Sequence, residues 1–271
     1  MVIGLIGAQN SHSVNFLKAI NEEKLYPGIS IRYIYGGDDP EISERLAEEY
    51  ELEQCCTEEE AIEKSEAVVV TYRKGSQHFD AVMKALKAGK HVFNDKPFAI
   101  KNSDAQDIVD YAREHDLLLC GGSIVKGVSD AKSLAPKIKP GDTIVISFAA
   151  EVDSEYDGYY FYGIHCVELC LMLCGLDFLS VSSVQNGSTV ISTVSFAENT
   201  CVLITSPDNY NLSVTVHNSD GNTLYPISLA GQCVGSDEFV KMLQTGKPPR
   251  DYEFYAVAVR LINEIVQSAG L

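Results

Sequence analysis

The sequence is poor in cationic side chains. It has 21 Lys and Arg against 38 Asp and Glu, which leaves a formal net charge of -17. Nucleic acids and anionic membrane surfaces are bound by clustered lysines and arginines, so we expect neither as a partner. No apolar run approaches the roughly 18 residues of a membrane-spanning helix. The first residues, MVIGLIGAQN, lack the basic segment of a secretion signal, so we expect a cytoplasmic protein.

The eight cysteines lack the spacing of a disulfide framework. Cys55 and Cys56 are adjacent, and Cys166, Cys170 and Cys174 recur every four residues, so reduced thiols are expected. The second group raises a metal site as an alternative. Its spacing differs from the close Cys-x-x-Cys pair of common zinc sites, and free cysteine packs as a small buried hydrophobe. We therefore expect no metal.

The first 120 residues alternate strand and helix patterns. Short β-branched runs predict buried parallel strands at Val2–Ile6, Ile29–Tyr35, Ala67–Thr71, His91–Asn94 and Leu117–Cys120. Between them, amphipathic patterns predict helices at Ser11–Asn21, Glu41–Glu49, Gln77–Ala88 and Ser103–His115. Such units build a doubly wound parallel sheet with right-handed crossovers. We therefore predict an α/β protein whose residues 1–120 form a Rossmann-type dinucleotide-binding domain.

After Gly121-Gly122 the pattern changes. An apolar helix is predicted at Ile164–Leu173 and a final helix at Glu253–Gln267. Runs separated by turn dipeptides predict strands at Thr143–Ala149, Val181–Gln185, Thr189–Phe196, Thr200–Thr205, Leu212–His217 and Thr223–Ser228. We predict that residues 121–271 form an α+β domain with an open, mostly antiparallel sheet, which serves substrate binding and oligomerisation.

The first strand runs into a loop and then a helix, where a dinucleotide fold carries its glycine fingerprint. The loop reads Gly7-Ala8-Gln9-Asn10-Ser11-His12. Only Gly7 matches one of the three glycines, and Gln9 and His12 take the other two positions. Backbone N–H groups and the helix N-terminus would meet the pyrophosphate here, helped by the side chains of Gln9, Ser11 and His12. An ordinary strand–turn–helix packing unit is the alternative.

The second strand ends close to two acidic residues, Asp38 and Asp39. An acidic side chain at this place can hold the ribose diol of the cofactor, and no arginine follows at once to favour a 2′-phosphate. We therefore favour NAD over NADP. In the alternative interpretation, both residues only start a turn and cap the helix after Pro40.

Residues 68–100 carry the most specific pattern, VVVTYRKGSQHFDAVMKALKAGKHVFNDKPFAI. This stretch resembles the Gfo/Idh/MocA (glucose–fructose oxidoreductase and inositol 2-dehydrogenase) family. The matching residues are Thr71, His78, Ala88-Gly89-Lys90-His91-Val92 and Asp95-Lys96-Pro97. Asp95 replaces the family's glutamate and Tyr72 the proline of its Thr-Pro pair. The resemblance continues at Gly163–Glu168, which is similar to the family's Gly-x-His-x-x-Asp segment, and in the last helix.

The resemblance implies an NAD(P)-dependent oxidoreductase that acts on a small polyhydroxylated substrate such as a sugar or cyclitol. It implies that Lys96 contacts substrate and nicotinamide, where a cation stabilises developing negative charge. His165 would exchange the hydroxyl proton, and Glu168, one turn further on, would orient it. Solvated lysine and structural histidine are the alternatives. The implied cofactor-binding residues are Gly7, Ala8, Gln9, Asn10, Ser11, His12, Asp38, Thr71, Tyr72, His78, Asp95, Lys96 and Pro97.

One position departs from the family pattern. Phe161 stands where catalytic members carry an aspartate, within the run Tyr159-Tyr160-Phe161-Tyr162. Either Tyr162 joins Lys96 and His165 in catalysis, although a phenol with a pKa near 10 is a poor base, or the protein is a non-catalytic, ligand-binding or regulatory homologue. The aromatic run could also stack on a sugar or pack between domains. The resemblance further implies a homo-oligomer formed through the open sheet, with a monomer as the alternative.

Overall fold

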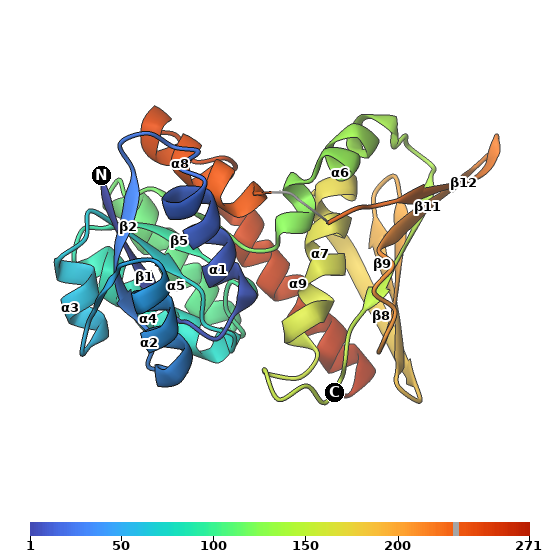
Figure 1. Ribbon diagram of the computed structural model, residues 1–271. Helices are drawn as coiled ribbons and strands as arrows, with labels where there is room; N and C mark the ends of the chain where they lie inside the picture. Colours follow the sequence, from blue (N-terminus) through green and yellow to red (C-terminus); the bar gives the residue numbers. More distant parts are fainter. Residues whose placement is uncertain (230–232) are drawn as a thin grey trace. The chain divides into compact units, whose positions relative to one another are not determined.

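The computed structural model describes residues 1–229 and 233–271, which divide into two compact units (Figure 1). Unit 1 comprises Met1–Ala99, Ser103–Gly122 and Cys233–Glu253, and unit 2 comprises Ile100–Asn102, Ser123–Gln232 and Phe254–Leu271. The expected division into residues 1–120 and 121–271 therefore differs at Cys233–Glu253, a segment that belongs to unit 1. Helix α8 (Val234–Thr245) belongs to unit 1 because its Phe239 packs edge-on against Phe16 and Phe93 in the core of that unit.

Unit 1 is built on a six-stranded parallel sheet with the order β3-β2-β1-β4-β5-β6. The strands are β1 (Val2–Ile6), β2 (Ser30–Tyr35), β3 (Glu53–Gln54), β4 (Ala67–Val70), β5 (His91–Asn94) and β6 (Leu119–Gly121). Every residue of β4 is buried, as expected for a central strand covered on both faces. The predicted doubly wound fold is confirmed. Among the strands of this sheet, only β3 was not predicted, because a two-residue strand shows no periodicity.

Helices connect the strands of unit 1. They are α1 (Ser11–Leu17, continued by a π-helical turn at Lys18–Glu22), α2 (Pro40–Glu49), α3 (Glu58–Glu63), α4 (His78–Lys87) and α5 (Asn102–Glu114). The N-cap of α1 is Asn10, whose side chain accepts from the backbone N–H of His12 at 3.1 Å. Asp39 caps α2 ahead of Pro40 by accepting from Ile42 N at 3.0 Å. Short polar side chains thus start both helices.

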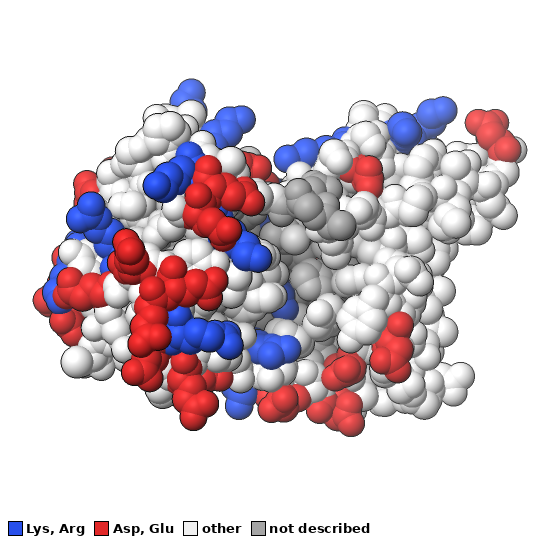
Figure 2. Space-filling model, viewed as in Figure 1, with Lys and Arg blue, Asp and Glu red and all other residues white. Residues whose placement is uncertain are grey.

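Unit 2 contains the second six-stranded sheet, with the order β12-β11-β7-β10-β9-β8. Its strands are β7 (Thr143–Ala149), β8 (Phe178–Asn186), β9 (Thr189–Phe196), β10 (Thr200–Ser206), β11 (Ser213–Asn218) and β12 (Gly221–Pro226). Only β7 and β10 pair in parallel, so the predicted mostly antiparallel sheet is confirmed. None of these strands contains Asp, Glu, Lys or Arg. In the view of Figure 2, acidic side chains gather over unit 1 instead.

Helix α7 (Tyr160–Cys174) packs on β7 and β10 of this sheet. Most of its residues are buried, which explains why the helix is apolar on all sides. It begins earlier than the predicted Ile164, because the aromatic residues of its first turn take part in the packing. The other helices of unit 2 are α6 (Ser129–Leu134) and α9, whose span Glu253–Ala269 starts at the last residue of unit 1. Within the described ranges, no helix is long and apolar enough to cross a membrane.

Candidate functional site

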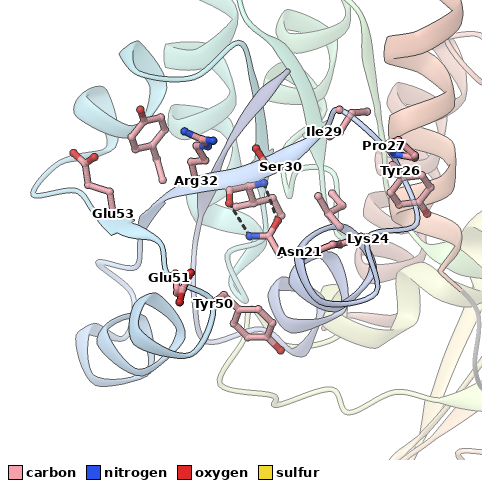
Figure 3. Close-up of a pocket in the computed structure, with 14 residues that line it drawn as sticks. Asn21, Lys24, Tyr26, Pro27, Ile29, Ser30, Arg32, Tyr50, Glu51 and Glu53 are labelled. Atoms are coloured by element: carbon pink, nitrogen blue, oxygen red, sulfur yellow. Dashed lines mark hydrogen bonds between the residues drawn. The ribbon is translucent and has the colours of Figure 1, made fainter.

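A cavity of about 870 Å³ in unit 1 lies away from the predicted site residues (Figure 3). It is lined by the segment before β2, the first residues of β2 and the end of α2. Asn21 spans its floor through two hydrogen bonds with the backbone of Ile31, of 2.7 and 3.0 Å. Ligands of doubly wound folds bind at the opposite, carboxyl ends of the strands. The predicted residues lie at those ends, so we build the site there.

The loop after β1 requires glycine at its first position. Gly7 has a φ of +93°, and a Cβ added there would lie 2.7 Å from the backbone nitrogen of Tyr72. Thr71 donates a hydrogen bond from Oγ1 to the Gly7 carbonyl at 3.0 Å and is fully buried. Thr71 and Tyr72 thus support the loop, and the Thr71 hydroxyl also donates to the Ile6 carbonyl at 3.3 Å.

Tyr72 and His78 also turn into unit 1. The Tyr72 hydroxyl donates to Glu58 at 2.5 Å, and burial, then this carboxylate, raises the pKa of the phenol. His78 is fully buried and its Nε2 bonds to the Tyr72 carbonyl at 2.8 Å, while burial lowers the pKa of its imidazole. Both were expected to bind cofactor, which stays a prediction. The contacts of their side chains fix the segment after β4.

Asp38 is tied to the glycine loop. Its carboxylate accepts from the backbone N–H of Ala8 at 2.9 Å and of Gln9 at 3.1 Å, whereas Asp39 caps α2. The capping interpretation therefore holds for Asp39, whereas ribose binding by Asp38 stays a prediction. Two further N–H groups of this turn, those of Asn10 and Ser11, have no hydrogen-bond partner among residues 1–229 and 233–271. They are positioned as a helix N-terminus presents donors to an anion.

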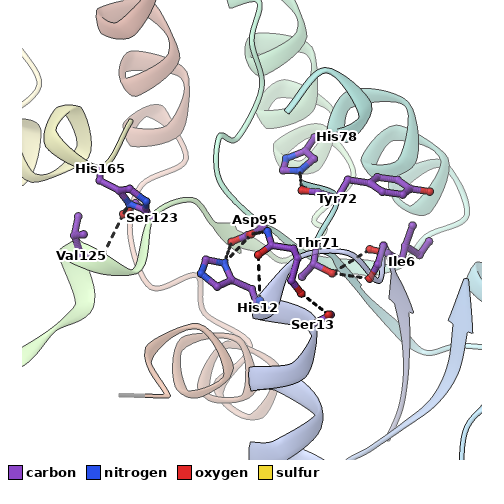
Figure 4. A network of polar contacts seen from close by, with 12 residues as sticks. Ile6, His12, Ser13, Thr71, Tyr72, His78, Asp95, Ser123, Val125 and His165 are labelled. Atoms are coloured by element: carbon purple, nitrogen blue, oxygen red, sulfur yellow. Dashed lines mark hydrogen bonds and ion pairs between the residues drawn. The ribbon is translucent and has the colours of Figure 1, made fainter. Parts of the chain in front are cut away.

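A polar network joins the start of α1 to the end of β5 (Figure 4). The fully buried carboxylate of Asp95 accepts from Asn10 Nδ2 at 2.8 Å and lies 2.8 and 2.9 Å from His12 Nδ1. Burial raises the pKa of Asp95, but the opposing effects of His12 and Lys96 outweigh it and lower the pKa overall. Because Nδ1 of His12 is bound to Asp95, the predicted contact of this side chain with phosphate would have to use Nε2.

Lys96 follows Asp95 and is buried rather than solvated, with 3% of its surface exposed. Burial lowers the pKa of its ammonium group to about 8, against the favourable charge of Asp95 and with the help of Arg73. The Lys96-Pro97 peptide bond is cis. Asn94, the last residue of β5, donates from Nδ2 to the Phe98 carbonyl at 2.7 Å and so closes this turn. The alternative of a solvated surface lysine is wrong.

In unit 2, His165 is held by a residue that the sequence did not single out. Its Nδ1 lies 2.7 Å from Ser123 Oγ, which also accepts from the backbone N–H of Val125 at 3.2 Å. The imidazole is 6% exposed. The rings of Tyr162 and Phe148 stand edge-on to it, with centroids 5.3 and 5.7 Å away. The signal in the sequence was a polar residue directly after the strand that ends in Gly121-Gly122.

Glu168 was expected to orient His165, but its carboxylate contacts Ser123 and Lys126 instead. Its Oε1 accepts from the backbone N–H of Ser123 at 2.9 Å, and its Oε2 lies 2.7 Å from Lys126 Nζ. The ammonium group also donates to the Ser123 carbonyl at 2.5 Å. Both charged side chains are almost completely buried. Glu168 and Lys126 therefore act on the backbone of Ser123, and only through it on the histidine.

The aromatic run at the start of α7 divides into different environments. The hydroxyl groups of Tyr159 and Tyr160 bond to Thr205 at 3.1 Å and to Asn263 at 2.9 Å. Burial raises the pKa of both phenols, which makes them still poorer bases. Phe161 is 8% exposed and packs against Tyr156 and Tyr162. Of the three tyrosines, only Tyr162 has its ring against His165.

The predicted residues thus form two clusters. In unit 1, the glycine loop, Asp38, Asp95 and Lys96 meet at the carboxyl ends of the strands, while Thr71, Tyr72 and His78 support them. In unit 2, His165 and Tyr162 are grouped with Ser123 by α7.

Comparison with known sequences agrees with the first cluster. Residues 1–122 match the sequence model of an oxidoreductase family with an NAD-binding Rossmann fold (GFO_IDH_MocA). An uncharacterized oxidoreductase of Streptococcus pneumoniae serotype 4 is 30% identical over 121 residues. That match covers 43% of this chain and 32% of the relative, so the chain spans about a third of the length of the curated relative it matches.

Solved structures extend the likeness to both units. The chain is similar to UDP-N-acetylglucosamine 3-dehydrogenase GnnA of Acidithiobacillus ferrooxidans, with a TM-score of 0.82 and 15% identity over 99% of this chain and 97% of that one. It is also similar to KijD10, a 3-ketoreductase of Actinomadura kijaniata solved with NADP and TDP-benzene. There the TM-score is 0.79 and the identity 16%, over 99% and 98% of the two chains. At these identities the likeness shows the fold.

Proposed function

We propose that this chain, whose residues 1–122 match the sequence model of the Gfo/Idh/MocA oxidoreductase family with its NAD-binding Rossmann fold, transfers a hydride between NAD(P) and a polyhydroxylated substrate. The observation that carries the proposal is Lys96, a buried cation two residues after the end of β5, with a pKa lowered to about 8. A lysine is rarely buried without a task, and perturbed groups of this kind mark functional sites. The names of the similar dehydrogenase and ketoreductase support a sugar-like or cyclitol-like substrate.

The residues of unit 1 fit the cofactor. Gly7 leaves room where a Cβ would collide, and the N–H groups of Asn10 and Ser11 would receive the pyrophosphate. Asp38 would accept from the ribose diol while it keeps its bonds to the loop. Its negative charge opposes a 2′-phosphate, which supports NAD over NADP.

Nicotinamide, when bound, supplies the acceptor or donor of the hydride, and the side chains handle the proton and the charge. In the oxidative direction, Nε2 of His165 would take the proton of the substrate hydroxyl group, and bound nicotinamide would supply the hydride acceptor. The oxygen carries negative charge as the carbonyl forms, and the ammonium group of Lys96 stabilises that charge. In the reverse direction, His165 returns the proton to the oxygen.

We assign the contact between His165 Nδ1 and Ser123 Oγ to a hydrogen bond donated by Nδ1–H, which fixes the tautomer of His165 for this role. A serine hydroxyl can accept two hydrogen bonds while it donates one. With Ser123 Oγ accepting from Nδ1–H, the lone pair of the imidazole is on Nε2, the atom assigned to the proton transfer. Tyr162 would then contribute its ring and hydroxyl to substrate binding rather than serve as the base, and Phe161 leaves the catalytic aspartate of the family without a counterpart.

The uncharged sheet of unit 2 supports the proposal of a homo-oligomer. Its exposed residues include the apolar side chains Leu179, Val184, Ile191 and Leu224. A face without charges and with exposed apolar side chains is suited to a second copy of the chain. All eight cysteines are free thiols, which supports our expectation of a reducing, cytoplasmic setting.

Titration of the purified protein with NADH and NADPH, followed by nicotinamide fluorescence, tests the proposal. We expect saturable binding, and turnover of members of a polyol and sugar panel that falls about a hundredfold or more in His165→Asn. His115→Asn, an exposed histidine at the end of α5, is the matched control and should keep its activity. No binding of either nucleotide at millimolar concentration would reject the oxidoreductase. Binding without turnover would favour the regulatory homologue.

Asp38→Asn separates the two nucleotides. Removal of the carboxylate charge should weaken NADH binding and improve NADPH binding, so that the ratio of the two dissociation constants shifts about tenfold, or 1.4 kcal/mol. Asp39→Asn is the control, because asparagine also caps helices and this residue bonds to α2. An equal loss for both nucleotides in Asp38→Asn would mean that the residue only shapes the loop.

A further inference from the structure

Three thiols meet between α7 and the sheet of unit 2. The sulfur atoms of Cys170, Cys174 and Cys201 all lie within 4.8 Å of one another. Cys170 and Cys174 are one turn apart on α7, so they share a face of the helix. Cys201 belongs to β10, where every second side chain, including Thr205, faces α7. The helix and the strand thus deliver the three sulfur atoms from two sides.

The sequence suggested a different group. The helical series Cys166, Cys170 and Cys174 raised a metal site only as an alternative, because its spacing differs from the close Cys-x-x-Cys pair of common zinc sites. In the structure Cys166 is outside the cluster, and Cys201, 27 residues after Cys174, takes its place. A helical repeat accounts for two of the thiols but not for the third from a strand.

We propose that Cys170, Cys174 and Cys201 bind one thiophilic metal ion, of the class of Zn²⁺ or Cu⁺, through three thiolates. Tetrahedral Zn–S bonds of about 2.3 Å place sulfur atoms about 3.8 Å apart, so the present arrangement needs to close by about an ångström at most. Soft thiolate ligands select these ions. No further His, Cys, Asp or Glu of the described residues joins the group, which leaves a coordination position for water or another exogenous ligand.

The surroundings of the cluster are consistent with binding from solution. Cys170 and Cys201 are fully buried, whereas Cys174 is partly exposed and gives an ion a way in. Binding one ion forms three metal–sulfur bonds and releases the thiol protons. The bound ion would fasten α7 to β10.

A titration with Cd²⁺ tests the site, since cadmium thiolates absorb in the near ultraviolet. The reduced, chelator-treated chain should bind one ion, visible as a charge-transfer band and as one added metal in native mass spectrometry. Zn²⁺ should compete with Cd²⁺ and raise the melting temperature, because a ligand of the native state stabilises it. This readout is independent of oxidoreductase activity.

Cys201→Ser and Cys174→Ser should each weaken Cd²⁺ binding at least about tenfold. Cys166→Ala, on the same helix, and the exposed Cys56→Ser should leave it unchanged. Cys174→Ser keeps the test valid if Cys201→Ser fails to fold. Absence of the band, equal binding by Cys174→Ser, or a disulfide between any two of the three cysteines in freshly isolated protein would overturn the proposal.

Discussion

Replacement of Lys96 by methionine is expected to abolish most of the activity and at the same time to stabilise the fold. The charge of Lys96 is the proposed stabiliser of the substrate oxygen, and loss of one such donor lowers kcat about a hundredfold to a thousandfold. Folding buries this ammonium group and lowers its pKa to about 8, which makes the charge unfavourable in the native state at pH 7. Methionine removes that penalty, so the free energy of unfolding should rise by roughly 1–3 kcal/mol.

The pH dependence of the native protein provides a second measurement of the same group. Activity should fall as the pH rises through about 8, because Lys96 then loses its proton. Stability should change in the opposite direction. Between this pKa and the value of about 10.4 in the unfolded chain, the unfolded state binds more protons, so the contribution of Lys96 to stability increases with pH.

Urea denaturation and steady-state kinetics of Lys96→Met check both effects. Lys87→Met, at an exposed position of α4, is the matched control and should change neither. Unchanged kcat/KM in Lys96→Met would exclude a role of this lysine in the reaction. A free energy of unfolding lower in Lys96→Met than in the unsubstituted protein would show that the charge of Lys96 is compensated in the native state.

Substitution of either Glu168 or Lys126 by an uncharged residue should be the most destabilising single change in unit 2. The two groups lie 2.7 Å apart with 0% and 2% of their side chains exposed. Removal of one partner leaves a buried charge without compensation, which typically lowers the free energy of unfolding by about 3–5 kcal/mol. We expect this loss for Glu168→Gln, which retains an acceptor for Ser123 N, and for Lys126→Met.

The double variant Lys126→Met/Glu168→Gln should recover much of that loss, because no charge remains buried. Denaturation of the four proteins gives the interaction energy of the pair. Lys64→Met is the control, since this lysine pairs with Glu53 and Glu60 on the surface and such pairs contribute at most about 1 kcal/mol. Strictly additive single effects would contradict the coupling. Activity should fall with stability here, because the pair holds the backbone of Ser123, the partner of His165.

The periodic elements of this protein could be read directly from the amino-acid order. The strand Thr189–Phe196 was predicted with the bounds it has in the structure. Its buried and exposed positions alternate, and the residue types alternate with them. The helix predicted at Glu41–Glu49 begins one residue earlier, at Pro40, and the helix predicted at Gln77–Ala88 is one residue shorter at each end. Each of these features depends on neighbours within a few residues, where local backbone preferences and side-chain alternation decide.

The family pattern located Lys96 and His165, but not what surrounds them. The residues that decide the chemistry of each are distant in the chain or unmarked by periodicity. Asp95 binds His12 over a separation of 83 residues, and Ser123 reaches His165 over 42. His12 and Glu168 likewise contact Asp95 and Lys126, partners that the sequence did not indicate.

The sequence was therefore enough for the two sheets, for most of their strands and helices, and for the doubly wound fold of unit 1. Tertiary structure alone decided the return of α8 to unit 1, the burial of Lys96, the pairing of Glu168 with Lys126 and the arrival of Cys201 beside Cys170 and Cys174. The physical reason is the range of the interactions. Periodicity reports which face of an element is buried, whereas pKa values, ion pairs and metal ligands depend on which distant element that face meets.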